Sequence, residues 1–286
     1  MDAKRKIAIS GANGQLGLSL KDIAHIYEAD YDFIYCSREE LDIADTDQIN
    51  AFFQEQKPDL FFNFAAYTNV DLAEEEKEKA FLINATGAEN LAIACREANC
   101  HLIHISTDYV YPGIGQTAFK EDQAENELNV YGASKRAGEI AVLKTWNKSS
   151  VIRTSWLYSK HKNNFVKSMI RYGVERDVLT VVNDQIGSPT WTRDLLQSIF
   201  VLIQTDEPYG IFNYSNEGKC SWYDFAKSIM QLKEIDCQIK PIPTKEFPRP
   251  ARRPGFSLMD KSKIKAQTQV VIPHWEASLK KMLSEY

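Results

Sequence analysis

KIAISGANGQLG at residues 6–17 is the most informative stretch of this sequence. A short apolar run ends in a turn with glycines at positions 11, 14 and 17, and apolar residues at helical spacing follow over 15–27. Glycine permits a tight turn and lets the backbone approach a pyrophosphate, which the N-terminus of the following helix stabilises. A plain strand-to-helix turn is the alternative, but the position in a first βαβ unit favours a dinucleotide-binding loop.

The alternation of strand and helix continues outward from this turn. Short apolar runs predict strands at 33–36, 59–65, 101–106 and 151–155, and helical patterns lie at 45–56, 81–98 and 130–145. Strands that alternate with helices form a parallel sheet covered on both faces, and right-handed crossovers make it doubly wound. We therefore predict an α/β fold with a doubly wound parallel sheet of the Rossmann type.

The alternation of strand and helix patterns becomes less regular in the second half of the chain. Residues 183–191 are typical of a loop, and residues 241–255 contain five of the ten prolines, which excludes a helix interior. We expect residues 1–155 to form the dinucleotide-binding Rossmann domain. Residues 156–286 should form mainly a smaller C-terminal substrate-binding lobe, with some elements returning to the Rossmann core.

Composition excludes several classes of protein. Hydrophobic residues make up 44% and charged residues 26% of the 286 residues, which is typical of a folded chain. The net charge of −5 provides no electrostatic footprint for nucleic acid or an anionic membrane, and no apolar run approaches the ~20 residues of a membrane span. Five cysteines without a CxxC pair indicate neither a disulfide framework nor a zinc ribbon. We expect a cytoplasmic protein without nucleic-acid or membrane partners.

The end of the second predicted strand bears on the choice of cofactor. An acidic residue there would bond the ribose 2′-hydroxyl of NADH, whereas an arginine accommodates the 2′-phosphate of NADPH. The strand ends in Cys36-Ser37-Arg38, before Glu39-Glu40. We expect Arg38 to lie over the 2′-phosphate, so NADPH is the predicted cofactor and NADH the alternative. A solvated surface arginine is the other interpretation of Arg38.

A tyrosine and a lysine are the candidate catalytic pair. Tyr131 and Lys135 lie four residues apart in a predicted helix and therefore share a face, although an exposed helix face is the simpler interpretation. A nearby ammonium favours the phenolate, which makes the phenol a better proton donor. Ser106-Thr107-Asp108 ends a predicted strand, where a hydroxyl can hydrogen bond a substrate carbonyl as charge develops. The glycine turn, the Ser106-Thr107 strand end and the Tyr131/Lys135 pair follow one another along the chain. Together, in this order, they are far more specific evidence than any one of them.

Further motifs accompany these along the chain. They are KPDLFFNFAAYTNVDLAE at 57–74, INATGAENLA at 83–92, HISTDYVY at 104–111, NVYGASKRAGE at 129–139, RTSWLY at 153–158, NNF at 163–165, NDQIGSPT at 183–190 and PARRPGFSLMD at 250–260. With them the chain resembles the extended short-chain dehydrogenase/reductases and, more narrowly, the dTDP-4-dehydrorhamnose reductase family. The resemblance implies NADPH-dependent reduction of the C4 keto group of dTDP-4-dehydro-L-rhamnose to dTDP-L-rhamnose, and hence a nucleotide-sugar substrate.

The resemblance also implies roles for individual residues. Tyr131 would protonate the C4 oxygen, Lys135 would bind the nicotinamide ribose and lower the pKa of the tyrosine, and Thr107 would polarise the carbonyl. The cofactor would be contacted by Gly11, Asn13, Gly14, Gln15, Leu16, Asp42, Ile43, Ala65, Ala66 and Tyr67. The substrate would be contacted by Asp108 and Trp156, and its diphosphate by Arg252 or Arg253. Asn84 would either join a proton relay or bend its helix.

Several of these residues also have a structural interpretation. Trp156 and Tyr158 are equally typical of core aromatics. The acidic residues Asp71 and Glu74-Glu75-Glu76 are more typical of a solvated helix N-terminus than of a metal site, and we expect no metal. His101 and His104 flank a buried strand and are expected to be structural.

Two other functions are compatible with the resemblance. A nucleotide-sugar epimerase/reductase of another pathway would need a cysteine and a histidine beside the sugar, which the matched substrate segments lack. A non-catalytic regulatory subunit, resembling that of methionine adenosyltransferase, would bind the cofactor and contact another enzyme without turnover. Homodimers are common among the relatives that the chain resembles, so a homodimer is one assembly that the resemblance suggests.

Overall fold

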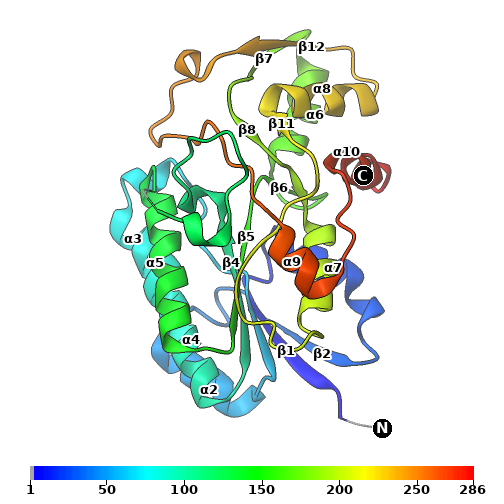
Figure 1. Ribbon diagram of the computed structural model, residues 1–286. Helices are drawn as coiled ribbons and strands as arrows, with labels where there is room; N and C mark the ends of the chain where they lie inside the picture. Colours follow the sequence, from blue (N-terminus) through cyan, green and yellow to red (C-terminus); the bar gives the residue numbers. More distant parts are fainter. Residues whose placement is uncertain (1–2, 126) are drawn as a thin grey trace.

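A six-stranded parallel sheet forms the centre of the molecule in a computed structural model that describes residues 3–125 and 127–286 (Figure 1). Its order is β2-β1-β3-β4-β5-β10. The strands are β1 (Arg5–Ser10), β2 (Tyr31–Tyr35), β3 (Leu60–Asn63), β4 (His101–Thr107), β5 (Ser149–Thr154) and β10 (Gly210–Asn213). The chain runs from β1 out to β2 and then returns to the other side of β1 for β3, which is the reversal of a doubly wound sheet. The predicted Rossmann-type fold is confirmed.

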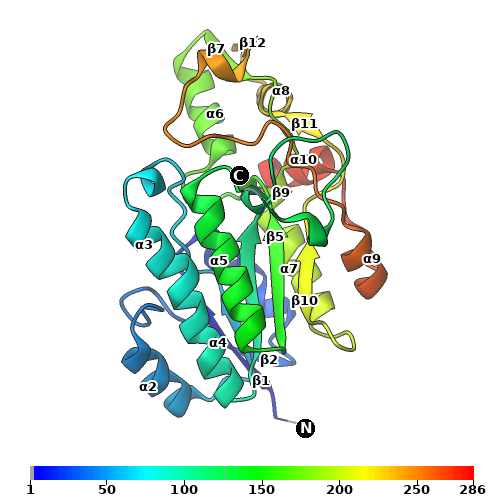
Figure 2. The same cartoon turned by 60° about the vertical axis from the view of Figure 1, so that its left-hand side comes forward.

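Helices cover both faces of this sheet (Figures 1 and 2). One face carries α1 (Gln15–Ile23), α7 (Thr192–Leu202) and α9 (Ser262–Thr268), and the other carries α2 (Thr46–Gln56), α4 (Gly87–Glu97) and α5 (Val130–Thr145). Ile7 and Ile9 of β1 belong to the core beneath α1 and α7, whereas Ala8 belongs to the core beneath α2 and α4. Both faces are therefore buried, which explains why the strands are continuous apolar runs.

Side-chain caps fix where the helices begin. The Asp45 carboxylate accepts hydrogen bonds from the backbone N–H groups of Asp47 and Gln48, so Asp45 is the N-cap of α2. The Asn129 side chain accepts from the Gly132 N–H at 2.8 Å and caps α5 in the same way. This second cap places Tyr131 in the first turn of α5, directly above the sheet edge.

The helix predicted over 81–98 is interrupted. It consists of α3 (Lys77–Phe81), a π-helical turn η3 (Leu82–Thr86) and α4. Asn84 lies in this turn, where its side chain hydrogen bonds the backbone N–H and C=O of Tyr67 and the hydroxyl of Ser134. Because these contacts connect the segment after β3 to α5, they give Asn84 a structural role in the π turn. Single short turns complete this half of the chain: η1 (Ala24–Ile26), η2 (Leu72–Glu74), η4 (Asp108–Val110) and η5 (Glu121–Gln123).

A smaller group of elements lies over the carboxyl ends of the strands (Figure 1). It contains α6 (Phe165–Glu175), α8 (Trp222–Leu232), α10 (Trp275–Ser284) and the parallel pair β7 (Val178–Val182) and β12 (Gln238–Ile242). These elements share a core that includes Tyr158, Phe225 and Leu279. From the same half of the chain, α7, β10 and α9 pack with the central sheet. The predicted boundary between residues 155 and 156 stays a prediction.

Two segments expected to be irregular contain short ordered elements. Within 183–191, β8 (Ile186–Gly187) pairs with β11 (Cys220–Ser221), and β9 (Thr190–Trp191) pairs with β6 (Leu157–Tyr158). Strands of two residues have no hydrophobic period, so the sequence pattern does not reveal them. The proline-rich segment begins in β12 and contains only the short turn η6 (Thr244–Glu246), in agreement with its lack of a helix interior.

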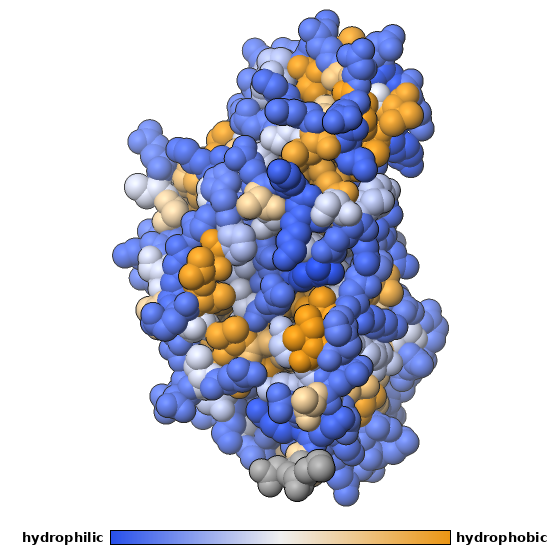
Figure 3. Space-filling model, turned by 90° about the vertical axis from the view of Figure 1, so that its right-hand side faces the viewer, coloured by the Kyte–Doolittle hydropathy of each residue, from blue (hydrophilic) through white to orange (hydrophobic). Residues whose placement is uncertain are grey.

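Surface polarity agrees with the composition. Over the described residues, no helix combines the length and the apolar character needed to cross a membrane. On the face shown in Figure 3, hydrophobic residues form separate groups between hydrophilic ones.

Candidate active site

The site begins at the reversal point of the sheet, where β1 and β3 end side by side. Gly11 follows β1 with a φ of +67°. A Cβ on Gly11 would lie 2.6 Å from the Ala65 backbone nitrogen and 2.7 Å from the Phe64 carbonyl carbon. A Cβ on Gly17 would lie 2.4 Å from the Ala12 carbonyl oxygen. Both positions therefore require glycine, one for the left-handed turn and both for close backbone packing.

A cavity of about 770 Å³ opens at this point. It brings together most of the residues predicted to bind the cofactor: Gly11, Asn13, Gly14, Gln15, Leu16, Arg38, Asp42, Ile43, Ala65 and Ala66. Among the residues that the structure describes, no side chain caps the N-terminus of α1, which begins at Gln15 on the cavity wall. Its free N–H groups and the close glycine backbone fit the pyrophosphate of a dinucleotide.

Two of the predicted cofactor residues are placed differently from expectation. The Tyr67 side chain lies outside the cavity lining, because its hydroxyl donates to the Glu76 carboxylate at 2.7 Å. Gln15 does line the cavity, but its side-chain oxygen accepts from Ser159 and Asn164. The Gln15 side chain thus fixes the loop after β6 and leaves its backbone for the pyrophosphate.

Arg38 lies on the rim of the same cavity. Its side chain is 66% exposed, and Nη2 lies 3.3 Å from the Asp42 carboxylate. The exposed ion pair is weak, so the guanidinium is available to a phosphate group at the adenosine end of the cavity.

The three candidate catalytic residues meet on the cavity wall. Tyr131 and Lys135 project from α5, and Thr107 ends β4. Burial raises the pKa of Tyr131 to about 12, although a hydrogen bond with Thr107 acts in the opposite direction. Tyr131 is therefore protonated at neutral pH and can donate a proton. The Lys135 Nζ lies 3.3 Å from His104 Nε2, and the lowering of the Tyr131 pKa by Lys135 stays a prediction.

Asp108 adds a buried carboxyl group to the wall. The Thr107 hydroxyl donates to its Oδ1 at 3.1 Å. Burial raises the pKa of Asp108 to about 6, and the hydrogen bonds from Ser257 and Thr107 oppose this shift. Asp108 is thus positioned to exchange hydrogen bonds with a polar ligand beside Thr107.

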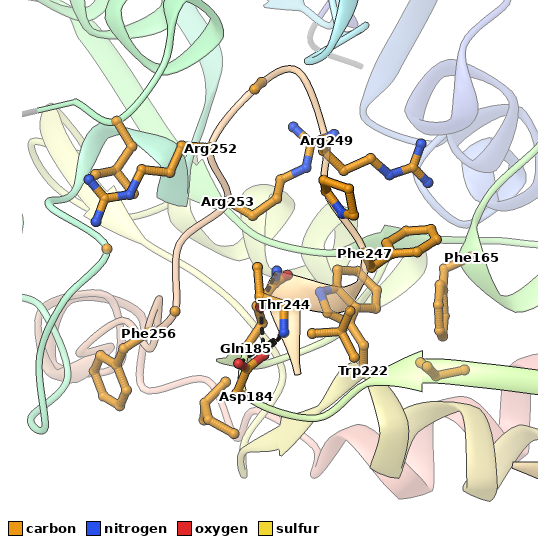
Figure 4. Close-up of a pocket in the computed structure, with 18 of the residues that line it drawn as sticks. Phe165, Asp184, Gln185, Trp222, Thr244, Phe247, Arg249, Arg252, Arg253 and Phe256 are labelled. Carbon is orange, nitrogen blue, oxygen red and sulfur yellow. Dashed lines mark hydrogen bonds between the residues drawn. The ribbon is translucent and has the colours of Figure 1, made fainter. Parts of the chain in front are cut away.

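A second cavity, of about 1240 Å³, adjoins the first, and Tyr109 lines both. Its aromatic residues include Phe165, Trp222 and Phe247 (Figure 4). The Trp156 indole lines the first cavity and stacks on Trp222, with ring centroids 3.6 Å apart. Trp156 is therefore a cavity residue, whereas Tyr158 is fully buried in the core.

The adjacent arginines 252 and 253 differ in orientation. Figure 4 shows their side chains extending away from each other. Arg252 is exposed, whereas Arg253 is four-fifths buried and its Nη2 lies 2.9 Å from Asp71. The second terminal nitrogen of Arg253, Nη1, is buried without a hydrogen-bond partner in the described part of the chain. An unsatisfied guanidinium nitrogen beside the cavity is suited to an anionic ligand.

Comparison with known proteins agrees with this geometry. The family model described as the RmlD substrate binding domain matches residues 5–286. The chain belongs to this family. It is 37% identical to the spore coat polysaccharide biosynthesis protein SpsK of Bacillus subtilis, over 98% of this chain and 97% of that protein. It is also 37% identical to a dTDP-4-dehydrorhamnose reductase of Aggregatibacter actinomycetemcomitans, over 96% and 97% of the two chains.

A solved structure of an RmlD-type protein is similar over the whole chain. The crystal structure of dTDP-4-dehydrorhamnose reductase from Bacillus anthracis, in complex with NADP, has a TM-score of 0.96 and 41% identity, covering 99% of this chain and 100% of that one. The resemblance inferred from motifs is confirmed.

Three of the four acidic residues that this RmlD-family chain carries at 71–76 have protein partners. Asp71 pairs with Arg253, Glu74 accepts from the Val130 N–H, and Glu76 accepts from Tyr67 and pairs with Lys79. Among residues 3–125 and 127–286, no group of three or more His, Cys, Asp or Glu side chains could hold a metal ion.

The sequence motifs gave no site role to several residues of the cavities, and His104 was expected to be structural. Tyr109 joins the two cavities, and Asn63 and His104 lie behind Lys135. A signal was present for Asn63 and His104, because each places a polar side chain within an apolar strand. No local pattern marks Trp222, which reaches the site from α8.

Proposed function

We propose that this protein reduces the C4 keto group of dTDP-4-dehydro-L-rhamnose to give dTDP-L-rhamnose, with NADPH as the reductant. The observation that carries the proposal is the meeting of Tyr131, Thr107 and Lys135 on the wall of a dinucleotide-sized cavity that adjoins an arginine- and aromatic-lined one. NADPH supplies a hydride to C4 of the sugar when it is bound. The chain must therefore supply one proton and stabilise the developing charge.

Each catalytic side chain has one task in this reaction. The Tyr131 hydroxyl donates its proton to the C4 oxygen, which completes the alcohol as the hydride arrives. The Thr107 hydroxyl hydrogen bonds the same oxygen and stabilises its negative charge. The Lys135 ammonium holds the nicotinamide ribose and stabilises the phenolate that Tyr131 becomes.

The second cavity fits the nucleotide part of the substrate. Arg253 lines this cavity, and its guanidinium complements the charge of the diphosphate. Phe165, Trp222 and Phe247 supply faces on which a base can stack. Asp108 and Trp156 line the region between this cavity and Tyr131, where the sugar would lie.

The cavity linings favour a reductase over an epimerase. An epimerase of the kind considered would need a cysteine and a histidine beside the sugar. Across the described residues, neither cavity lining contains either residue type.

The five cysteines, at 36, 95, 100, 220 and 237, are all buried and unpaired, which is consistent with a reducing, cytoplasmic location. A homodimer stays a prediction, to be checked by sedimentation.

Loss of NADPH absorbance in the presence of the keto sugar, generated by the preceding epimerase, tests the proposal. We expect turnover with the wild-type protein, and comparison with NADH measures the cofactor preference. Tight NADPH binding without turnover of this sugar would contradict the proposal and favour either a regulatory subunit or another keto sugar.

A further inference from the structure

A row of buried polar side chains crosses three neighbouring strands behind Lys135. Ser10, Asn63 and His104 are register partners on β1, β3 and β4. The Ser10 Oγ lies 2.8 Å from Asn63 Oδ1, and Asn63 Nδ2 lies 3.0 Å from His104 Nδ1. All three side chains are at most 1% exposed. They sit on the face covered by α5, at the reversal point of the sheet.

Lys135 completes this row. Its Nζ lies 3.3 Å from His104 Nε2, and the residue is 2% exposed. A buried ammonium needs acceptors, and His104 is the hydrogen-bond partner that the described part of the chain offers to this nitrogen. The carboxylate of Glu139, one turn further along α5, is occupied by Arg153 and Arg136.

The directions of the bonds in the row depend on the charge of Lys135. An ammonium can only donate, so His104 Nε2 must then carry a lone pair and Nδ1 the proton. The proton on Nδ1 is received by the Asn63 amide oxygen, and the amide NH₂ group turns to the Ser10 hydroxyl. With the Asn63 amide in the orientation described above, its Nδ2 donates to His104 Nδ1 and Nε2 carries the proton, which only an uncharged lysine can accept. A charged Lys135 therefore requires the Asn63 amide to turn by 180°, which exchanges its oxygen and its NH₂ group.

We propose that His104 is a positioning residue for the catalytic lysine. Its Nε2 accepts a hydrogen bond from the Lys135 ammonium and holds it at the cavity wall. Asn63, with its amide turned so that the oxygen faces His104 Nδ1 and the NH₂ group faces Ser10, holds His104 in the tautomer that keeps Nε2 free of a proton. The row thereby keeps the lysine charged and directed toward the ribose and Tyr131. The kinetic part of this inference rests on the proposed reductase function, whereas the tautomer part does not.

The surroundings of Lys135 agree with this assignment. Lys135 faces His104 from β4 and Glu139 from its own helix, and it shares the cavity wall with Asp108 and Tyr109 from η4 and with Tyr131. Arg153 from β5 is bound to Glu139. Burial lowers the pKa of Lys135 to about 8 and holds the pKa of His104 well below its usual range. His104 is thus neutral at physiological pH and able to accept.

The first test reads the tautomer without substrate or cofactor. Protein labelled with ¹⁵N-histidine is observed by NMR at pH 6.5, with His104→Gln used to assign the signals. We expect a neutral His104 with Nδ1 protonated and Nε2 unprotonated, and we expect Lys135→Met to shift the Nε2 signal. A protonated Nε2 in the wild type, or an Nε2 signal that Lys135→Met leaves in place, would overturn the proposal.

The second test separates positioning from folding. His104→Phe removes the acceptor, so turnover should fall about 10- to 100-fold, and its alkaline limit should move about one pH unit lower because the ammonium is less stabilised. In His104→Gln, the side-chain oxygen can take the place of Nε2 and should restore most of the turnover and the original pH limit. A His104→Phe protein that folds and keeps the wild-type pH profile would overturn the proposal.

His101 provides the matched control. It lies on the same strand, is also buried, and hydrogen bonds Ser150 instead of Lys135. His101→Phe is expected to lower the unfolding temperature without moving the pH profile of turnover. If the wild type has no turnover of the keto sugar, the proposed function fails, and the NMR result alone decides the role of His104.

Discussion

The cofactor cavity and the arginine-lined cavity meet at Tyr109, but the chain builds them in different ways. The walls of the first come largely from residues that directly follow β1, β2, β3 and β4, together with the first turns of α5. The walls of the second come from loops and helix surfaces widely separated in sequence, at 113–115, 165–172, 180–186 and 244–256. A parallel sheet aligns its strand ends, whereas the second cavity depends on how separate elements pack.

This difference separates chemistry from recognition. Residues at the strand ends are buried and held by backbone and neighbouring side chains, so they define the reacting geometry. Arginines and aromatics in the second cavity are more exposed, and in the proposed function they contribute to affinity for the nucleotide. Substitutions in the two cavities should therefore alter different kinetic constants.

Tyr131→Phe should have the largest effect. Removal of the proton donor is expected to lower kcat about 1,000-fold, while the dissociation constant for NADPH stays close to that of the wild type. Steady-state kinetics and fluorescence titration measure the two quantities. Near-normal turnover in this variant would mean that the proton comes from another group, with Asp108 the next candidate.

The two adjacent arginines offer a matched pair for the second cavity. Arg253→Ala should raise the KM for the nucleotide sugar about 10- to 100-fold, because a charge-assisted contact to the diphosphate is lost. Arg252→Ala changes the same residue type in the same loop and should raise the KM only a few-fold. Equal effects of the two substitutions would contradict the orientation shown in Figure 4.

The buried carboxyl group of Asp108 should make the unfolding free energy of the protein depend on pH. Since burial raises its pKa to about 6 in the folded protein, its contribution to stability is complete below its unfolded pKa and is lost as the pH rises through 6. Asp108→Asn removes this loss. Relative to the wild type, the variant should gain about 2–3 kcal/mol in unfolding free energy between pH 4 and pH 8. Urea unfolding at both pH values measures the difference, and parallel pH curves would refute it.

Arg38→Ala should have the smallest effect. Its exposed guanidinium lies at the rim, so the preference for NADPH over NADH is expected to fall about 10-fold, in line with one charge-assisted contact. The ratio of kcat/KM values for the two cofactors measures this preference. Turnover with NADH should hardly change, since NADH has no 2′-phosphate. An unchanged ratio would leave Arg38 as a surface residue paired with Asp42.

Local patterns in the sequence determined the fold and the centre of the cofactor cavity. Apolar runs alternating with helical periods predict the doubly wound sheet, because strands buried on both faces must be continuously apolar. Gly17 is required by a backbone contact with Ala12 that the turn itself creates, and Gly11 by the positive φ of that turn. The contact of Gly11 with Phe64 and Ala65 comes from the distant end of β3. Tyr131 and Lys135 share a face of α5 because helix geometry fixes the direction of residues four apart.

Only the tertiary structure decided the features that depend on side chains from distant segments. It distinguished Arg253 from Arg252 through Asp71, turned Tyr67 away from the cavity toward Glu76, and stacked Trp156 on Trp222. It also placed His104 against Lys135, although the two are 31 positions apart in sequence. Sequence periodicity fixes which face of its own element a residue occupies. The partner across that face is fixed by packing between elements, which a single local pattern does not encode.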